Sequence, residues 1–274
     1  MQGSNNPSVV LTFTTSDPTG GSGLQGDILT VAALGGHPLS VMTGFTVQDT
    51  ARIEGFSATE GDWVADQARA LLEDIPVQAF KIGQISSAEN AMEIADVLGD
   101  YPDIPVVFDV HLRGLFGTDV LADEETLGTL CELLVPLSSV LIINGSDAPR
   151  LVLNDEDGEE DLPEEVTQAE YARHLLEMGA RMVLLTGAHE QTPQIVNTLY
   201  GPGGVLRTDA WERLPGSWHG AGDTLSAALA TLLAQGMEVS AAVHEAQAYT
   251  WQTLAQGWRL GMGHNLPNRF CKRG

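Results

Sequence analysis

The sequence predicts an α/β fold in which a central, mainly parallel sheet is flanked by helices on both faces. Short apolar segments rich in Val, Ile and Leu alternate along the chain with segments that have the periodicity of amphipathic helices. Such alternation is typical of successive βαβ units. A chain of 274 residues can bury one large core, and neither a repeat nor a low-complexity linker divides it. We therefore expect a single domain over residues 1–274.

The first half is expected to open with a strand and a helix that flank a glycine-rich loop. The strand covers Ser8 to Thr14, and the loop reads Ser16-Asp17-Pro18-Thr19-Gly20-Gly21-Ser22-Gly23. Its glycines predict a turn before a helix over Leu24–Leu34. Further strands are expected at Leu39–Phe45, Gln78–Ile82 and Ile104–Asp109, and further helices at Asp62–Leu72 and Ala88–Leu98.

The second half continues this alternation and places polar residues where strands end. Strands are expected at Val140–Ile143 and Arg181–Leu185, and helices at Gln168–Met178, Leu225–Ala234 and Val239–Ala255. Ligands of open parallel sheets bind at the carboxyl ends of the strands. Just past an apolar strand or in a glycine loop lie Asp17, Gln48, Lys81, Asp109, Asn144, Thr186 and Asp223. These residues are the candidates for a site at that edge.

The charge balance limits the classes of partner. The chain has 37 acidic and 13 basic residues, a formal net charge of −24, which argues against nucleic acid and anionic membranes. No apolar run approaches the roughly 20 residues of a membrane span, and Met1 to Asn6 does not resemble a signal peptide. Cys131 and Cys271 are isolated, so free thiols in a reducing compartment are expected. We expect a cytoplasmic protein.

The segment from His219 to Ser226 has the pattern of an anion hole with its own base. Gly220 and Gly222 allow successive N–H groups to converge, and the helix that follows adds the partial positive charge of its N-terminus. Asp223 stands where it could take a proton from an alcohol while those N–H groups stabilise a transferring phosphoryl group. The same residues are also consistent with a glycine turn and an Asp N-cap.

Four stretches together resemble the hydroxymethylpyrimidine/phosphomethylpyrimidine kinases of thiamine biosynthesis, a family with the three-layer ribokinase-like fold. The resemblance spans Val9 to Leu254. It implies ATP-dependent phosphorylation of the hydroxymethyl group of 4-amino-5-hydroxymethyl-2-methylpyrimidine and of its monophosphate, with Mg²⁺, by a homodimer. The stretches are the loop and helix start from Ser16 to Asp27, Thr46-Val47-Gln48-Asp49-Thr50, Lys81-Ile82-Gly83, and Leu214 to Leu225.

The resemblance also implies a role for each candidate residue. The catalytic group is Asp223 with Gly220, Ala221 and Gly222; the substrate is bound by Asp17, Gly20, Gly21, Gln48 and Gln84; the nucleotide by Asn144, Thr186, Gly187 and His219; and the metal by Asp109 and Asp147. Simpler readings stay open. Gln48 could be a surface turn residue, Asp109 or Asn144 a helix cap, and His219 a cap of the glycine turn. Lys81 could supply charge or be structural, and the tryptophans are expected in the core or an interface.

Three departures from the family pattern, at Asp223, Gln84 and the Asp109-Val110-His111 stretch, leave the substrate open. Asp223 replaces the usual cysteine of the anion hole and is ionised at neutral pH, where a thiol mostly is not. Gln84 replaces methionine, and Asp109-Val110-His111 stands in place of Asp-Pro-Val. Two further departures concern the nucleotide and the metal: Thr186 replaces a lysine and so removes a cation near the nucleotide, and Asp147 stands where a glutamate is more usual. Two alternatives remain: a pyridoxal, pyridoxine or pyridoxamine kinase, and a catalytically silent relative that binds a vitamin precursor. The sequence does not decide between one and two phosphoryl transfers.

Overall fold

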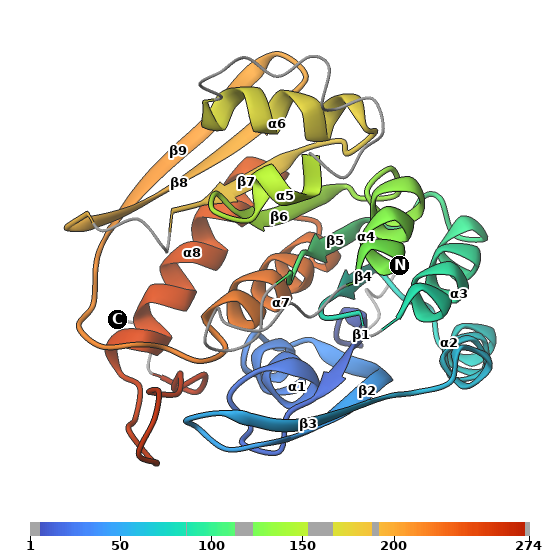
Figure 1. The fold of residues 1–274 in the computed structure, drawn as a ribbon, viewed down its shortest axis with the longest axis horizontal. Helices are drawn as coiled ribbons and strands as arrows, with labels where there is room; N and C mark the ends of the chain where they lie inside the picture. Colours follow the sequence, from blue (N-terminus) through green and yellow to red (C-terminus); the bar gives the residue numbers. More distant parts are fainter. Residues whose placement is uncertain (1–5, 86, 113–122, 153–166, 188–191, 272–274) are drawn as a thin grey trace.

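The computed structural model describes residues 6–85, 87–112, 123–152, 167–187 and 192–271. They form one nine-stranded sheet with the order β3-β2-β1-β4-β5-β6-β7-β8-β9 (Figure 1). The strands are β1 (Val9–Ser16), β2 (His37–Gln48), β3 (Ile53–Ala58), β4 (Ala79–Ile82), β5 (Val106–Asp109), β6 (Val140–Asn144), β7 (Val183–Thr186), β8 (Gln194–Gly201) and β9 (Gly204–Glu212). The six strands from β2 to β7 in this order pair in parallel. β3, β8 and β9 add antiparallel edges.

Helices cover both faces of the sheet and form two separate apolar cores. They are α1 (Gly23–Ala33), α2 (Gly61–Asp74), α3 (Ala88–Gly99), α4 (Glu124–Thr129), the π-helical turn η1 (Leu130–Leu134), α5 (Ala148–Val152), α6 (Gln168–Glu177), α7 (Ala221–Ala234) and α8 (Val239–Ala255). One core joins the sheet to α2, α3, α4, η1, α5 and α6. The other joins it to α1, α7 and α8. The predicted three-layer α/β fold is confirmed.

Adjacent strand residues point to opposite faces, so each central strand contributes to both cores. In β1, Leu11 and Phe13 pack into the first core, and Val10 packs into the second. All three are fully buried. This double burial explains why the central strands are rich in Val, Ile, Leu and Phe.

Local capping explains several helix starts. The Ser87 hydroxyl accepts a hydrogen bond from the Asn90 N–H at the start of α3. Thr167 and Glu170 form a reciprocal capping box at the start of α6. Both arrangements satisfy N–H groups that a helix leaves without internal partners. No helix in the described ranges has the length and apolar character needed to cross a bilayer.

The sequence did not predict β3, β8, β9, α4 or α5. β9 alternates between buried or half-buried and exposed side chains, and β3 is exposed at most positions. Such strands lie at an edge and carry many polar residues, so they lack the continuous apolar run that marks the central strands. β8 and β9 together form a hairpin that widens the sheet beside β7 (Figure 1).

Candidate active site

A cavity of about 790 Å³ opens along the carboxyl ends of the parallel strands, where the sequence predicted a site. Most of the predicted site residues line it: Asp17, Gln48, Gln84, Asp109, Asn144, Asp147, Thr186, His219, Gly220, Ala221, Gly222 and Asp223. Gly20, Gly21 and Gly187 lie in adjoining segments and do not line it. Lys81 is buried beneath the cavity floor.

The start of α7 forms the centre of the cavity. Gly220 is its N-cap and has a φ of 85°, a left-handed conformation that favours glycine. A Cβ at Gly220 would overlap the carbonyl oxygen of Gly21, so this position also needs glycine for space. The helix begins at Ala221, four residues before the predicted start, and Asp223 therefore lies in its first turn rather than at the N-cap. The N–H groups of this turn have no acceptor within the helix.

Asp223 belongs to a buried group of three charges. Its Oδ1 lies 3.2 Å from Nζ of Lys81, and the same Nζ lies 3.0 Å from Oδ2 of Asp27. Lys81 and Asp27 are fully buried, and Asp223 is nearly so. Burial opposes ionisation of Asp223, but the charges of Lys81 and His111 hold its pKa well below the usual range. Asp223 is thus available as an ionised base at neutral pH.

The two carboxylates that share Lys81 have opposite pKa shifts. Burial raises the pKa of Asp27 despite the opposing charge of Lys81. Lys81 itself is buried, yet Asp27 and Asp223 raise its pKa above the ordinary value, so it stays protonated. The amine of Lys81 is consequently a fixed positive charge under the cavity.

Asp109 ends β5 and is held from two sides. The Ser226 hydroxyl donates to its Oδ2 at 2.8 Å, and Nε2 of His111 lies 3.1 Å from the same oxygen. Burial lowers the pKa of His111, but the charge of Asp109 outweighs it and raises that pKa to about 9. Among the described residues, Asp109, His111 and Asp223 place one ligand atom each within 4.8 Å of one another.

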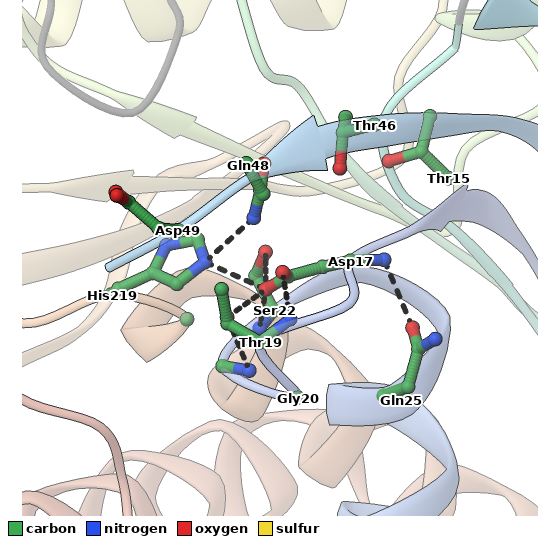
Figure 2. A network of polar contacts seen from close by, with 12 residues as sticks. Thr15, Asp17, Thr19, Gly20, Ser22, Gln25, Thr46, Gln48, Asp49 and His219 are labelled. Atoms are coloured by element: carbon green, nitrogen blue, oxygen red, sulfur yellow. Dashed lines mark hydrogen bonds and ion pairs between the residues drawn. The ribbon is translucent and has the colours of Figure 1, made fainter. Parts of the chain in front are cut away.

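Asp17 accepts most of the hydrogen bonds that hold the glycine-rich loop, which follows β1 and forms one end of the cavity (Figure 2). Its Oδ2 accepts hydrogen bonds from the Ser22 N–H at 2.8 Å and from the Ser22 and Thr19 hydroxyls, and its Oδ1 accepts from the Thr19 N–H at 2.8 Å. Nε2 of His219 lies 2.7 Å from Oδ2. Burial raises the pKa of Asp17, but His219 and Thr19 together lower it to about 2. Asp17 is therefore ionised, and its hydrogen bonds to Thr19 and Ser22 hold the loop in its turn.

Gln48, at the end of β2, reaches the same cluster. Its Nε2 lies 3.3 Å from Nε2 of His219 (Figure 2). His219 therefore lies between Asp17 and Gln48, at the end of the cavity formed by the glycine-rich loop. Gln84 is nearby, and its side-chain oxygen accepts a hydrogen bond from the Thr15 hydroxyl at 3.4 Å. These polar groups line one wall of the cavity.

The far end of the cavity is built on β6, β7 and the β8–β9 hairpin. Asn144 and Thr186 end neighbouring parallel strands and pair across them. The Gly187 N–H donates to the side-chain oxygen of Asn197 at 3.0 Å. Ala188 and His189, which follow Gly187 in the motif, lie outside the described residues.

Gln247 of α8 ties this end together. Its Oε1 accepts hydrogen bonds from the Asn197 amide at 2.8 Å and from the Trp211 indole at 2.9 Å, and its Nε2 donates to Asp209 at 3.1 Å. Trp211 lines the cavity, as do Trp218 and Trp251, whereas the sequence placed the tryptophans in the core or an interface. β8, β9 and their pairing with α8 were not predicted, so nothing in the sequence directed Trp211 to the site.

Arg269 is a buried residue of this region that the sequence analysis did not identify. It is 3% exposed and lies 248 positions from Gly21, whose carbonyl oxygen accepts from its Nη2 at 2.6 Å. No local motif surrounds it, and only the three-dimensional packing of the C-terminal segment reveals the contact.

Comparison with known proteins agrees with these features. Residues 17–268 match the family model for phosphomethylpyrimidine kinase. The chain is 32% identical to the hydroxymethylpyrimidine/phosphomethylpyrimidine kinase of Escherichia coli, covering 93% of this chain and 94% of the relative. It is 34% identical to that of Streptomyces coelicolor, covering 94% and 92%. A thiamine biosynthesis bifunctional protein, ThiED of Geobacter sulfurreducens, is 34% identical over 95% of this chain, which spans about half (52%) of that protein.

Solved structures show the same fold. The phosphomethylpyrimidine kinase of Clostridium difficile superimposes with a TM-score of 0.74 and 28% identity, covering 89% of this chain and 97% of that one. The pyridoxal kinase of Bacillus subtilis superimposes with a TM-score of 0.82 at 24% identity, covering 96% and 98%. The resemblance inferred from the motifs is confirmed.

Proposed function

Because the chain belongs to the phosphomethylpyrimidine kinase family, we propose that it transfers the terminal phosphoryl group of ATP to 4-amino-5-hydroxymethyl-2-methylpyrimidine and then to its monophosphate. The observation that carries this proposal is the ionised Asp223 carboxylate in the first turn of α7, inside the cavity. One continuous sheet supports the whole cavity, so we propose that the chain acts as a single kinase domain.

In this mechanism, Asp223 accepts the proton of the substrate alcohol as the alcohol oxygen bonds to the terminal phosphorus of ATP and the bond from that phosphorus to the bridging oxygen breaks, which releases ADP. The N–H groups of Ala221 and Gly222 stabilise the negative charge that builds on the transferring group, and the N-terminal partial charge of α7 adds to their effect. Phosphoryl transfer depends mostly on positioning and charge stabilisation. Lys81, paired with Asp223, keeps the base ionised and holds it in place.

The substrate is proposed to bind between Gln48 and the loop built around Asp17. The carboxamide of Gln48 offers one donor and one acceptor side by side, which matches an aminopyrimidine edge. His219 and Asp17 fix the environment of that amide. Gln84 forms part of the same lining and presents a polar group to the ring.

The nucleotide is proposed to bind at the other end, beside Asn144, Thr186 and Gly187. The carboxylates of Asp109 and Asp147 line this part of the cavity, and carboxylate oxygens are the donors that Mg²⁺ prefers together with nucleotide phosphates. Asp109 places a carboxylate oxygen within 4.8 Å of one from Asp223, an oxygen-donor arrangement that fits the metal, and we propose that Asp109 and Asp147 would hold it. When bound, Mg²⁺ neutralises phosphate charge during transfer.

A second candidate function is phosphorylation of a B6 vitamer. The carboxylate of Asp223 at the anion hole and the polar Gln84 in the substrate wall favour it, since both differ from the pyrimidine kinase pattern. A third outcome, binding without turnover, would correspond to a catalytically silent relative.

One assay separates these functions. The purified protein is incubated with Mg²⁺ and ATP against hydroxymethylpyrimidine, its monophosphate, pyridoxal, pyridoxine and pyridoxamine, and both ADP and the phosphorylated alcohol are measured. We expect turnover of the two pyrimidines. Turnover of only a B6 vitamer would replace the proposal, and ligand binding without ADP release would identify a silent binder.

We also propose a cytoplasmic homodimer that associates through β2 and β3. Phe45, Val47 and Phe56 expose apolar side chains there, with between 44% and 57% of their surface accessible. Phe45 and Val47 of β2 lie on one face of the sheet and are proposed to form the contact, whereas Phe56 of the edge strand β3 pairs with Thr46 and lies on the other face. Light scattering on the wild-type protein and on Val47→Lys tests this: a monomeric mass for the wild type would reject the dimer.

A further inference from the structure

The segment that follows α8 returns to the active site and packs beneath it. We call residues 257–271 the C-terminal arm. The Asn265 carbonyl accepts a hydrogen bond from the His219 N–H at 2.9 Å, and the Asn265 N–H donates to the Ser217 carbonyl at 2.9 Å. Trp258 pairs with Leu266 within the arm. The arm is thus attached to the segment that leads into the anion hole.

Among the hydrogen bonds of the described residues, Arg269 is the only residue of the arm whose side chain contacts both the glycine-rich loop and the start of α7. Its Nη2 donates to the Gly21 carbonyl at 2.6 Å and its Nη1 to the Gly20 carbonyl at 3.2 Å. Its Nε donates to the Thr224 hydroxyl at 3.2 Å, in the first turn of α7. The Gly220 carbonyl lies 3.4 Å from Nη2.

The two halves that Arg269 joins touch each other directly. Residues 17–22, which we call the substrate loop, place the Gly21 carbonyl against Gly220 so closely that no side chain fits there. A carbonyl oxygen buried against a glycine Cα needs a donor. Arg269 supplies it and holds the loop in contact with the helix start.

We propose that Arg269 is a positioning residue that holds the substrate loop against the start of α7, and so sets the distance between the acceptor alcohol and the transferring phosphoryl group. The inference rests on the proposed kinase function and adds a residue beyond the 17–268 range of the family model. A planar guanidinium with donors on three nitrogens suits this task, because it contacts the loop and the helix at the same time. The amine of a lysine is a single point and cannot.

The backbone orientation explains why this contact bears on catalysis. In a trans peptide the carbonyl and the following N–H point in opposite directions. The Gly21 carbonyl points to Arg269, and the Ser22 N–H on the other side of that peptide donates to Asp17. Loss of the guanidinium would therefore release the peptide that orders Asp17, the centre of the loop. A displacement of about 1 Å between reacting groups can lower a rate by about 100-fold.

The backbone of Arg269 has its own anchor. Its carbonyl accepts a hydrogen bond from the Tyr249 hydroxyl at 2.7 Å, from the buried side of α8. The Asn268 N–H donates to the Thr253 carbonyl of α8 at 2.9 Å. Because these contacts do not involve the guanidinium, the arm is expected to stay docked when only the side chain of Arg269 is changed.

The test compares Arg269→Lys and Arg269→Met with Arg259→Ala. Arg259 is an exposed arginine of the same arm whose contact, to the Met262 carbonyl, stays within the arm. The main readout is the coupling ratio, the amount of phosphorylated alcohol formed for each ADP released. We expect Arg269→Lys to lower kcat by about 10- to 100-fold and to lower the coupling ratio well below one. KM for ATP should change less than threefold, and Arg259→Ala should match the wild type.

Hydrogen–deuterium exchange provides a readout that needs no activity. We expect faster exchange in residues 17–22 and 220–224 of Arg269→Lys and no change in the β8–β9 hairpin. Should the Met variant fail to fold, the Lys variant, which keeps the charge, still gives both measurements. Unchanged exchange in both segments, or a reduced kcat with full coupling, overturns the proposal. A wild-type protein that phosphorylates no alcohol rejects the kinase function instead, and the exchange data still decide the role of Arg269.

Discussion

Lys81 places its amine 3.2 Å from the carboxylate of Asp223, although the two residues are 142 positions apart in the chain. The pair lies beneath the anion hole, where α7 begins, and Asp27 of α1 lies on the other side of the amine. The charge of Lys81 keeps the carboxylate of Asp223 ionised, and the ion pair holds that carboxylate in place. This arrangement leads to the first two predictions.

Replacement of the base should remove turnover and leave the fold. We expect Asp223→Asn to lower kcat by about 10²- to 10⁴-fold, the usual contribution of a general base. Lys81 keeps its ion pair with Asp27 in this variant, so the midpoint of urea unfolding should change little. Steady-state kinetics and urea titration measure the two effects. Asp66→Asn, at an exposed position of α2, is the control, and full activity of Asp223→Asn would exclude the assigned role.

Removal of the cation should instead destabilise the protein. Lys81→Met leaves two buried carboxylates next to each other without a positive charge, and the free energy of unfolding should fall by about 3–5 kcal/mol. The double variant Lys81→Met/Asp27→Asn removes one of the two buried carboxyl groups and should recover part of that loss. Urea unfolding of the three proteins tests this. A loss below about 1 kcal/mol for the single variant would show that the three charges are not coupled.

The glycines that flank α7, Gly220 and Gly236, allow the space needed at residue 220 to be tested separately from backbone strain. Gly220 before the helix and Gly236 after it have φ values of 85° and 83°, so alanine at either position costs about 1–2 kcal/mol of backbone strain. Only at Gly220 would the new Cβ meet another group, the Gly21 carbonyl. We expect Gly236→Ala to keep its activity, and Gly220→Ala to lose more stability and nearly all phosphoryl transfer.

The comparison is made by thermal unfolding and steady-state kinetics on both variants. Equal activity in the two proteins would mean that the close approach of residues 21 and 220 is not needed for transfer.

The ionised Asp17 should make stability depend on pH in the acid range. Its pKa is about 2 in the folded protein and lies near 3.8 when the group is unperturbed. A lowered pKa stabilises the fold fully above the unperturbed value, and that contribution disappears as the pH falls through the folded value. The difference in unfolding free energy between wild type and Asp17→Asn should therefore be largest above pH 4 and shrink toward pH 2. Urea titrations across this range measure it, and a constant difference would contradict the assignment.

The sequence predicted the parts of the fold in which each segment carries its own signal. Central strands such as 140–144 are buried on both faces, so their apolar character is visible without any partner. Strand 194–201, next to β7, and the edge strand 204–212, next to β8, mix polar and apolar residues and become recognisable only from their pairing in the sheet. The start of α7 was placed too late because Gly220 and Gly222 are typical of a turn, while in the structure Gly222 is already helical.

The candidate site was predicted to a similar extent and for similar reasons. Residues at strand ends or in glycine motifs, such as Asp109 and Asp223, line one cavity as expected. The cation that pairs with Asp223 is 142 positions away in the chain, and no spacing rule reveals it. Lys81 was noted as a possible source of charge, but its position between Asp27 and Asp223 required the structure. The assigned substrate, nucleotide and metal roles stay predictions.

The contact between Arg269 and Gly21 also affects when the site can form during synthesis. During synthesis, residues 17–22 and the first turn of α7 leave the ribosome before residue 269 does. Until then, the Gly21 carbonyl lacks its guanidinium donor. We therefore expect the loop of residues 17–22 and the start of α7 to be held together only after the arm has docked.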